Sequence, residues 1–234
     1  MRSIHFIHFI AMTLVALILL PGTRSFAKNG RKKDRDEAYR IVLTLKDGSV
    51  VNGYIRTSLM GGKSSVGVSE TPKGSFKEYQ AADVQSLVYP ATQEDPDEVV
   101  YVPEKALKNT PNLLNKKGKE YKKPVFLRLI FEGKTITGYI LPVVLSTTNA
   151  TTTTYYNSAQ YYYKVKGEEI ARPYWLDQKG ITIGGKKALK FYFKGHPAVV
   201  DYFDSEEFDF KEFNQHPETL LPVLDERLTD GGHE

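Results

Sequence analysis

Few residues of this chain have types and spacing suited to catalysis, and most of them lie near the C-terminus. His196, Asp201 and Ser205 supply the three side-chain types of a nucleophilic triad, in which a base activates a hydroxyl. The carboxylates between Asp204 and Asp209 are close enough in sequence to act as an acid–base pair or to bind a cation. One hypothesis is therefore a hydrolase with a site around His196 and the acids of Asp201–Asp209.

The spacing of these residues favours structural roles instead. No G-x-S-x-G turn surrounds Ser205, and the acids alternate with phenylalanines, which is typical of a solvated face beside a packed one. His196 and His216 each precede a proline, as at helix starts, and lack partners at metal-ligand spacing. Gly184-Gly185-Lys186-Lys187 lacks the full phosphate-loop pattern and is predicted to be a turn. We therefore predict no catalytic residue, no metal site and no cofactor.

The second candidate is a cluster of tyrosines between residues 151 and 165. Strands are predicted over 151–156 and 161–165, with a turn at 157–160 between them. Because side chains alternate along a strand, tyrosines then occur on both faces, and the outward ones suit binding of a sugar ring or a protein partner. The alternative is that cross-strand aromatic pairs only stabilise an exposed hairpin. The candidate binding residues are Tyr155, Tyr156, Tyr161 and Tyr162.

The clearest pattern that would position such residues is an internal repeat. Residues 41–55 (IVLTLKDGSVVNGYI) align with residues 126–140 (FLRLIFEGKTITGYI). The matching glycines are Gly48 with Gly133, and Gly53 with Gly138. Each copy is a predicted hairpin, because an acid–glycine pair favours a tight turn and a glycine within a strand marks a bend or a close backbone approach. Strands that bend sharply suit a small, curled barrel.

The string LKDGSVVNGYI at residues 45–55 resembles the first signature of Sm-like small β-barrels, in which an acid- or asparagine-glycine turn precedes a second glycine at this spacing. The resemblance implies a small barrel. It does not extend to RNA binding, because the family's aspartate and asparagine have no counterpart in Arg56–Gly62, and its arginine–glycine signature has none at Gln85–Tyr89. The whole chain also resembles uncharacterised exported bacterial proteins with tandem "DG…GY" hairpins, which implies a location and an architecture.

The remaining patterns predict further short strands and a helical end. Strands are predicted at 66–69, 76–79 and 83–89, helical turns at 103–107 and 111–114, and helices at 197–203 and 217–226. The predicted fold class is mainly β: two small curled antiparallel β-barrel or sheet units in tandem, with short C-terminal helices. The predicted boundaries are a signal peptide at 1–27, a polar leader at 28–38, a first β unit at 39–101, a linker with helical turns at 102–123, a second β unit at 124–193, a helical cap at 194–228 and a tail at 229–234.

The N-terminus predicts export. Arg2 precedes an apolar run from Ile4 to Leu20, and Ser25-Phe26-Ala27 places small residues where a signal peptidase cleaves. The alternative is a retained signal anchor, since the run approaches membrane-spanning length. Arg2 and Arg24 leave with the peptide, so 30 of 32 basic residues remain against 28 acidic ones, and this weak charge predicts no nucleic-acid partner. The chain contains no cysteine, so an oxidising compartment would bring no disulfides.

These patterns together predict an exported, non-catalytic binding or interaction module of the bacterial cell envelope, in the periplasm or outside the cell. Its ligand would be an envelope glycan or a protein partner. No stable membrane insertion is expected after signal cleavage. Two alternatives remain open: the hydrolase described above, and a signal-anchored structural protein of the envelope.

Overall fold

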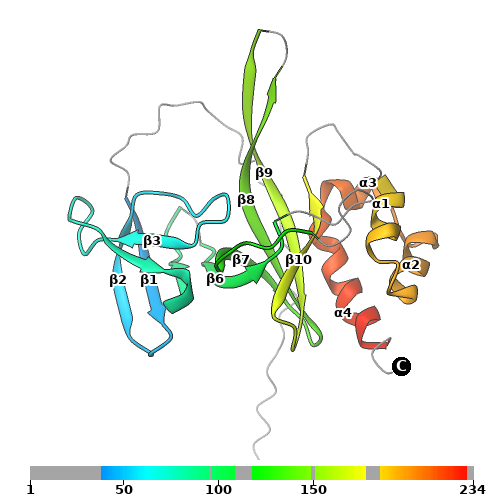
Figure 1. Ribbon diagram of the computed structural model, residues 1–234, viewed down its shortest axis with the longest axis horizontal. Helices are drawn as coiled ribbons and strands as arrows, with labels where there is room; N and C mark the ends of the chain where they lie inside the picture. Colours follow the sequence, from blue (N-terminus) through cyan, green and yellow to red (C-terminus); the bar gives the residue numbers. More distant parts are fainter. Residues whose placement is uncertain (1–37, 95, 109–117, 149–150, 178–184, 231–234) are drawn as a thin grey trace, which may run out of the picture. The chain divides into compact units, whose positions relative to one another are not determined.

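The computed structural model of the chain describes residues 38–94, 96–108, 118–148, 151–177 and 185–230 (Figure 1). All of them belong to one unit of the chain, Arg31–Glu234. The predicted signal peptide, most of the predicted leader and the helical turn predicted at 111–114 lie outside the described residues.

The fold is mainly β, with a large mixed sheet, a small two-stranded sheet and short C-terminal helices. The strands are β1 (Tyr39–Leu45), β2 (Val50–Ile55), β3 (Ser65–Val68), β4 (Lys77–Gln80), β5 (Val84–Tyr89), β6 (Val99–Ala106), β7 (Val125–Glu132), β8 (Ile136–Thr148), β9 (Thr153–Val165) and β10 (Ile170–Leu176). The helices are α1 (Gly185–Tyr192), α2 (Pro197–Asp204), α3 (Phe210–Gln215) and α4 (Leu220–Asp230), with short 3-10 helices at Ala81–Asp83 and Pro217–Thr219. The large sheet has the strand order β10-β9-β8-β7-β6-β5-β1-β2, and β3 and β4 form the small sheet.

The first predicted hairpin is formed by β1 and β2. At its turn Gly48 has a φ of 86°, a conformation that glycine adopts without strain. The carboxylate of Asp47 fixes the turn, because it accepts hydrogen bonds from the backbone N–H and the hydroxyl of Ser49 at 2.9 and 2.6 Å. Alternate residues of β1 are buried, including Ile41 and Leu43, so this hairpin presents one face to a core. The strands predicted at 66–69, 76–79 and 83–89 are confirmed to within one residue by β3, β4 and β5.

Strand β6 joins the two halves of the sheet. Its first part pairs with β5, its middle with β7, and its last residues pair in parallel with β10. The pairing therefore runs from β6 through β7, β8, β9 and β10 and returns to β6. The helical turn predicted at 103–107 is wrong, because the apolar run Val99–Val102 continues as a strand. Pro103 lies between the part paired with β5 and the part paired with β10, where its missing N–H interrupts no ladder on that side.

The second predicted hairpin is formed by β7 and β8, but the tyrosine-rich segment that follows differs from the prediction. The turn predicted at 157–160 is wrong: β9 runs without interruption and pairs with β8 from Thr153 to Val165. Residues 157–160 contain neither glycine nor proline, and their backbone is paired with residues 141–144 of β8. The hairpin partner of the tyrosines is therefore β8 and not a second tyrosine strand.

The helical end contains the two predicted helices and two that the sequence pattern did not indicate. Helix α2 confirms the helix predicted at 197–203, and a 3-10 turn followed by α4 corresponds to the one predicted at 217–226. Helix α1 begins at Gly185, within the predicted turn at 184–187, and α3 begins after Asp209, whose carboxylate accepts hydrogen bonds from the N–H groups of Lys211 and Glu212 at 2.7 and 3.1 Å. His196 and His216 occupy the N-cap positions before proline as predicted, but their side chains accept no capping hydrogen bond.

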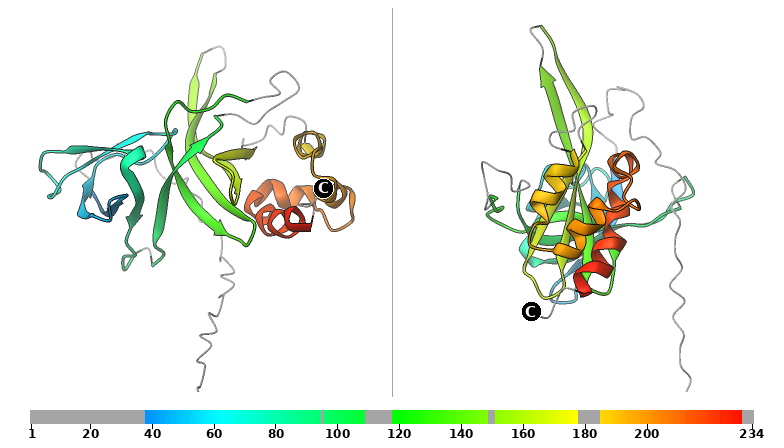
Figure 2. Two further views of the ribbon diagram at one scale, coloured as in Figure 1. Left: turned by 60° about the horizontal axis from the view of Figure 1, so that its bottom comes forward. Right: turned by 90° about the vertical axis from the view of Figure 1, so that its right-hand side faces the viewer.

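The helices pack against the second hairpin and β10 (Figure 2). Leu189, Phe203, Phe213 and Leu224 contribute one buried side chain from each helix to a cluster that includes Tyr174 of β10. The Tyr174 hydroxyl donates a hydrogen bond to the carbonyl of Pro217 at 2.9 Å, which ties the sheet to the start of the last helical segment. This cluster includes residues of β8, β9 and β10, the strands that carry or flank the candidate tyrosines.

Candidate functional site

The strongest candidate site lies where β8 and β9 continue past their neighbours. Strand β7 pairs with β8 only as far as Ile140, and β10 pairs with β9 only as far as Gln160. Beyond these points Val144–Thr148 and Thr153–Asn157 face each other in register and pair with no third strand in the described part of the chain. We call these two segments the ribbon; they form the far end of the long β8–β9 hairpin in Figures 1 and 2.

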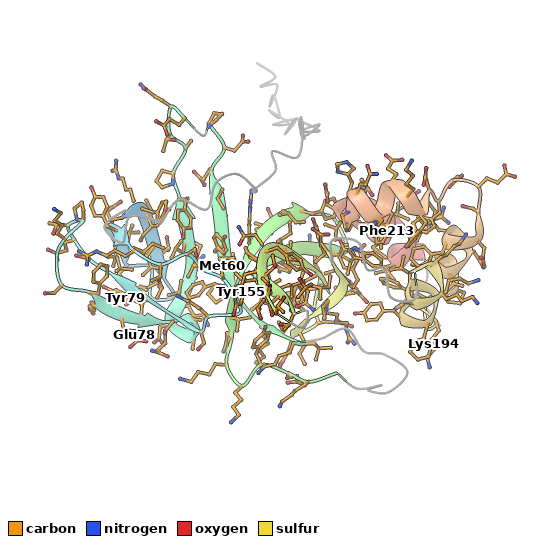
Figure 3. All side chains as sticks on the ribbon, turned by 90° about the horizontal axis from the view of Figure 1, so that it is seen from above. Met60, Glu78, Tyr79, Tyr155, Lys194 and Phe213 are labelled. Atoms are coloured by element: carbon orange, nitrogen blue, oxygen red, sulfur yellow. The ribbon has the colours of Figure 1, made fainter. Side chains whose placement is uncertain are left out.

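The ribbon carries apolar side chains on both faces. Tyr155 lies opposite Ser146 and diagonal to Val144 on one face, and these two apolar side chains are 72% and 51% exposed. Tyr155 is labelled in Figure 3, where the molecule is seen from above. On the other face Leu145 lies directly opposite Tyr156, and both are half-buried. Each face therefore offers one aromatic ring beside one aliphatic side chain, an arrangement suited to contact with another molecule.

The four predicted binding tyrosines do not lie on one surface. Tyr155 and Tyr156 belong to the ribbon, whereas Tyr161 and Tyr162 lie in the part of β9 that is flanked by both β8 and β10. Because β9 has no turn at 157–160, the second pair is carried into the core instead of back alongside the first. The structure thus brings Tyr155 and Tyr156 together and separates them from the other two.

The inner pair has the environment of structural tyrosines. Tyr162 is fully buried, and its hydroxyl lies within hydrogen-bonding distance of the Leu107 carbonyl (3.0 Å) and of Oε1 of Gln160 (2.9 Å). The ring of Tyr161 is half-buried, 6.2 Å from that of Tyr174. Burial raises the pKa of both Tyr161 and Tyr162, so both hydroxyls keep their protons in the ordinary pH range.

The residues of the hydrolase hypothesis are engaged in other contacts. The hydroxyl of Ser205 donates to the backbone carbonyl of Tyr202 at 2.8 Å, and Asp204 forms an ion pair with Lys190 at 2.7 Å that lowers the pKa of its carboxyl. Glu207 pairs with Arg227 at 3.5 Å. No hydrogen bond or ion pair joins His196 to Ser205 or to these acids, and partial burial lowers the pKa of the imidazole.

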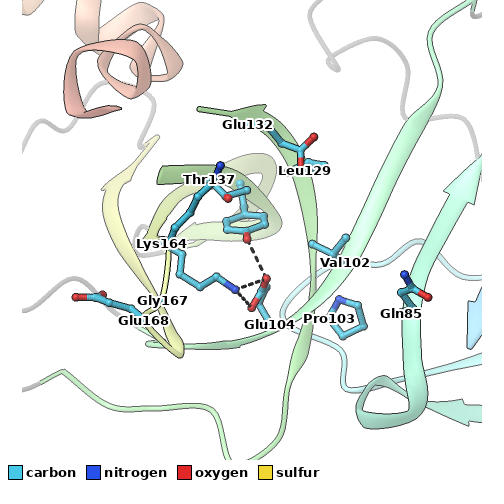
Figure 4. Close-up of a pocket in the computed structure, with 12 residues that line it drawn as sticks. Gln85, Val102, Pro103, Glu104, Leu129, Glu132, Thr137, Lys164, Gly167 and Glu168 are labelled. Atoms are coloured by element: carbon cyan, nitrogen blue, oxygen red, sulfur yellow. Dashed lines mark hydrogen bonds and ion pairs between the residues drawn. The ribbon is translucent and has the colours of Figure 1, made fainter. Parts of the chain in front are cut away.

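A polar cleft of about 410 Å³ lies beside β6, β8 and β9 (Figure 4). Glu104 occupies it: the ammonium of Lys164 is 2.6 Å from both carboxylate oxygens, and the hydroxyl of Tyr139 donates to one of them at 2.9 Å. Burial raises the pKa of Tyr139, which keeps that hydroxyl a donor. Since both oxygens of Glu104 already accept hydrogen bonds, the group links β6 to β8 and β9 and leaves no carboxylate oxygen poised for acid–base work. Its side chains come from three strands, and no local sequence pattern indicates that they meet.

The absence of charged residues marks the ribbon in the sequence. No charged residue occurs from Thr135 to Tyr163, a run of 29 residues that spans nearly all of β8 and β9. Charged side chains are the usual protection of exposed strands, so a long charge-free run in a chain with 26% charged residues identifies the segment.

Comparison of the chain with protein-family models, with curated proteins and with solved structures finds no match. Within the described residues, no group of three or more histidine and acidic side chains has the arrangement of a metal site. None of the described helices has the length and apolarity needed to cross a membrane.

Proposed function

We propose that the protein is an exported, non-catalytic binding module of the bacterial cell envelope that engages its partner through the ribbon. One observation carries this proposal: ten residues pair only with each other, carry no charge, and expose Tyr155 and Val144 on one face. A solvated ribbon without a binding role would be expected to carry the charges that prevent strand pairing. The signal peptide predicted at 1–27 supports the proposed location, in the periplasm or outside the cell.

The distribution of buried residues supports the finer architecture proposed from the repeat, two small curled units in tandem. One cluster collects Ile41, Leu43 and their neighbours up to Tyr101, and two further clusters collect residues from Ala106 onward. Phe126 of β7 belongs to the first cluster although it lies in the second predicted unit. In this arrangement the units act as a rigid base from which the ribbon extends.

The test is site-specific photocrosslinking in cells that export the full chain. A photoreactive phenylalanine at position 155 should give a light-dependent adduct with a partner, because that ring is the most exposed large apolar group described. The matched control is the same amino acid at Val50, which is 56% exposed in the first hairpin. Adducts from position 155 and none from position 50 support the proposal. If position 155 gives no more light-dependent adduct than position 50, the proposal is overturned.

A further inference from the structure

The ribbon has two open edges, one on β8 and one on β9. In a two-stranded antiparallel ribbon the outward N–H and C=O groups of each edge have no ladder partner, which makes an edge a template for another strand. We propose that the β9 edge of the ribbon pairs with the β9 edge of a second copy of the same chain in a two-fold arrangement. The inference rests on the proposed binding function of the ribbon and names its partner.

The distribution of charge favours a second copy as the occupant. Two other strands at the margins of the sheets carry protection: β4, which pairs only with β3, contains Lys77 and Glu78, and β10 contains Arg172 and Pro173 beyond its pairing with β6. The terminal strand β2 has no charge, but its outer edge is partly covered, because Tyr54 exchanges two backbone hydrogen bonds with Ser69. In a two-fold antiparallel pairing the central residue faces its own copy, so a charge there would face its own like. The ribbon contains no such charge.

The residues of the β9 edge suit self-pairing. Thr153, Thr154, Tyr155, Tyr156 and Asn157 are hydrogen-bonding, β-branched or aromatic side chains. An antiparallel pairing centred on Tyr155 would place the two Tyr155 residues together and Thr154 opposite Tyr156, which are favourable cross-strand combinations. The pairing would also convert two ribbons into a four-stranded sheet and so stabilise segments that are marginal as isolated pairs.

The size of the contact sets the expected strength. Five residues of each copy span roughly 17 Å of strand, well short of a standard protein interface, so dissociation in the micromolar range or weaker is expected. Sedimentation of the exported product over a range of protein concentration should therefore show a reversible monomer–dimer equilibrium.

The decisive variants place a charge at the pairing edge. Tyr155→Lys should weaken self-association about tenfold or more because two ammonium groups would face each other. Tyr155→Glu should do the same, and an equimolar mixture of the two variants should regain association, since opposite charges then meet. Val50→Lys, at a similarly exposed position of the first hairpin, should leave the equilibrium unchanged. If Tyr155→Lys misfolds, Thr154→Lys with Thr154→Glu provides a weaker form of this comparison, because the two copies of residue 154 lie diagonal to each other.

Disulfide trapping gives an independent readout because the natural chain contains no cysteine. A single cysteine at position 155, where the two copies of β9 face each other, should form a crosslinked dimer, and Val50→Cys should not. A monomer at all concentrations, with no trapped dimer, overturns the second copy as partner. If position 155 still gives a photoadduct with a different molecule, the binding function stands and only the partner is wrong. If it gives none, both proposals fail.

Discussion

The two hairpins of the internal repeat carry their second glycine at the same spacing but for different physical reasons. In the first hairpin a Cβ on Gly53 would lie 2.7 Å from the carbonyl oxygen of Ser69, so the glycine allows two backbones to approach. In the second hairpin a Cβ on Gly138 would lie 2.5 Å from the end of the Leu221 side chain. The first copy is thus covered by strand β3, and the second by helix α4.

The turn glycines of the two hairpins also occur for different physical reasons. Gly48 has a φ of 86° and open space around it, so the backbone conformation requires glycine. Gly133 leaves room for the carboxylate of Asp225 from α4, which accepts hydrogen bonds from the N–H groups of Lys134, Thr135 and Ile136 at 2.9, 2.6 and 2.9 Å. The repeated sequence pattern therefore preserves the hairpin itself. The element that covers each hairpin determines whether glycine is needed for its positive φ or for its lack of a side chain.

The largest effect that would test this comparison is expected at the in-strand glycines. Gly53→Ala should lower the free energy of unfolding by about 3 kcal/mol, because the added methyl meets backbone that cannot move without breaking the Tyr54–Ser69 pairing. Gly138→Ala is the matched control and should cost only about 1 kcal/mol, since the end of a leucine side chain can move. Urea denaturation of both variants measures the difference. Equal costs would contradict the distinction between strand cover and helix cover.

The next effect concerns the contact between α4 and the second turn. Asp225→Ala should destabilise the fold by about 2 kcal/mol, because it removes a charged acceptor from three backbone N–H groups. Gly133→Ala should act through the same contact by displacing that carboxylate. The double variant should therefore cost much less than the sum of the two single variants. Glu226→Ala, at the exposed neighbouring position, should change little. Additive effects would show that the two sites act separately.

A smaller effect is expected at the first turn. Gly48→Ala should cost about 1 kcal/mol, because alanine is strained at positive φ although nothing blocks its methyl group. An additional substitution of Asp225 should leave this cost unchanged, since no covering helix takes part in the first turn. Thermal unfolding of the single and double variants checks this independence, and a non-additive pair would contradict it.

The smallest effect is a difference in pH dependence. Burial raises the pKa of Asp225, but the three backbone hydrogen bonds outweigh it and hold the pKa below the ordinary 3.8. A lowered pKa in the folded state means that the stabilisation is complete above about pH 3.8 and is lost as the pH falls through the folded value. The difference in unfolding free energy between the natural chain and Asp225→Asn should therefore shrink on acidification. A difference that stayed constant between pH 6 and about pH 2 would exclude this linkage.

Much of the β architecture could be predicted from local patterns. Asp47-Gly48 predicted a turn, because tight hairpin turns need a residue that adopts positive φ without strain, and the two strands of the hairpin were predicted on either side of it. The helices at 197–203 and 217–226 could be predicted because proline occupies the first helical position without losing a hydrogen bond. In each case the cause lies within a few residues of its effect.

The errors arose where the cause is distant in sequence. Residues 157–160 have a turn-like composition, but pairing with residues 141–144 keeps them extended. That pairing moves Tyr161 and Tyr162 into the core and leaves only Tyr155 and Tyr156 in the ribbon. In the same way, Glu104, Tyr139 and Lys164 meet only because three strands are assembled around them. Helix α3 is short, and its clearest local indication was Asp209 at the capping position, within a cluster of acids that suggested other roles.

The sharing of β6 between the two halves has a consequence for how the molecule can be divided. Its beginning completes the pairing of β5, its middle pairs with β7, and its end pairs with β10. A protease nick or a truncation near residue 98 would deprive the N-terminal fragment of its last neighbour, and one near residue 107 would leave the C-terminal fragment without a closing strand. Neither fragment is therefore expected to fold autonomously, and calorimetry of the intact protein should record one melting transition.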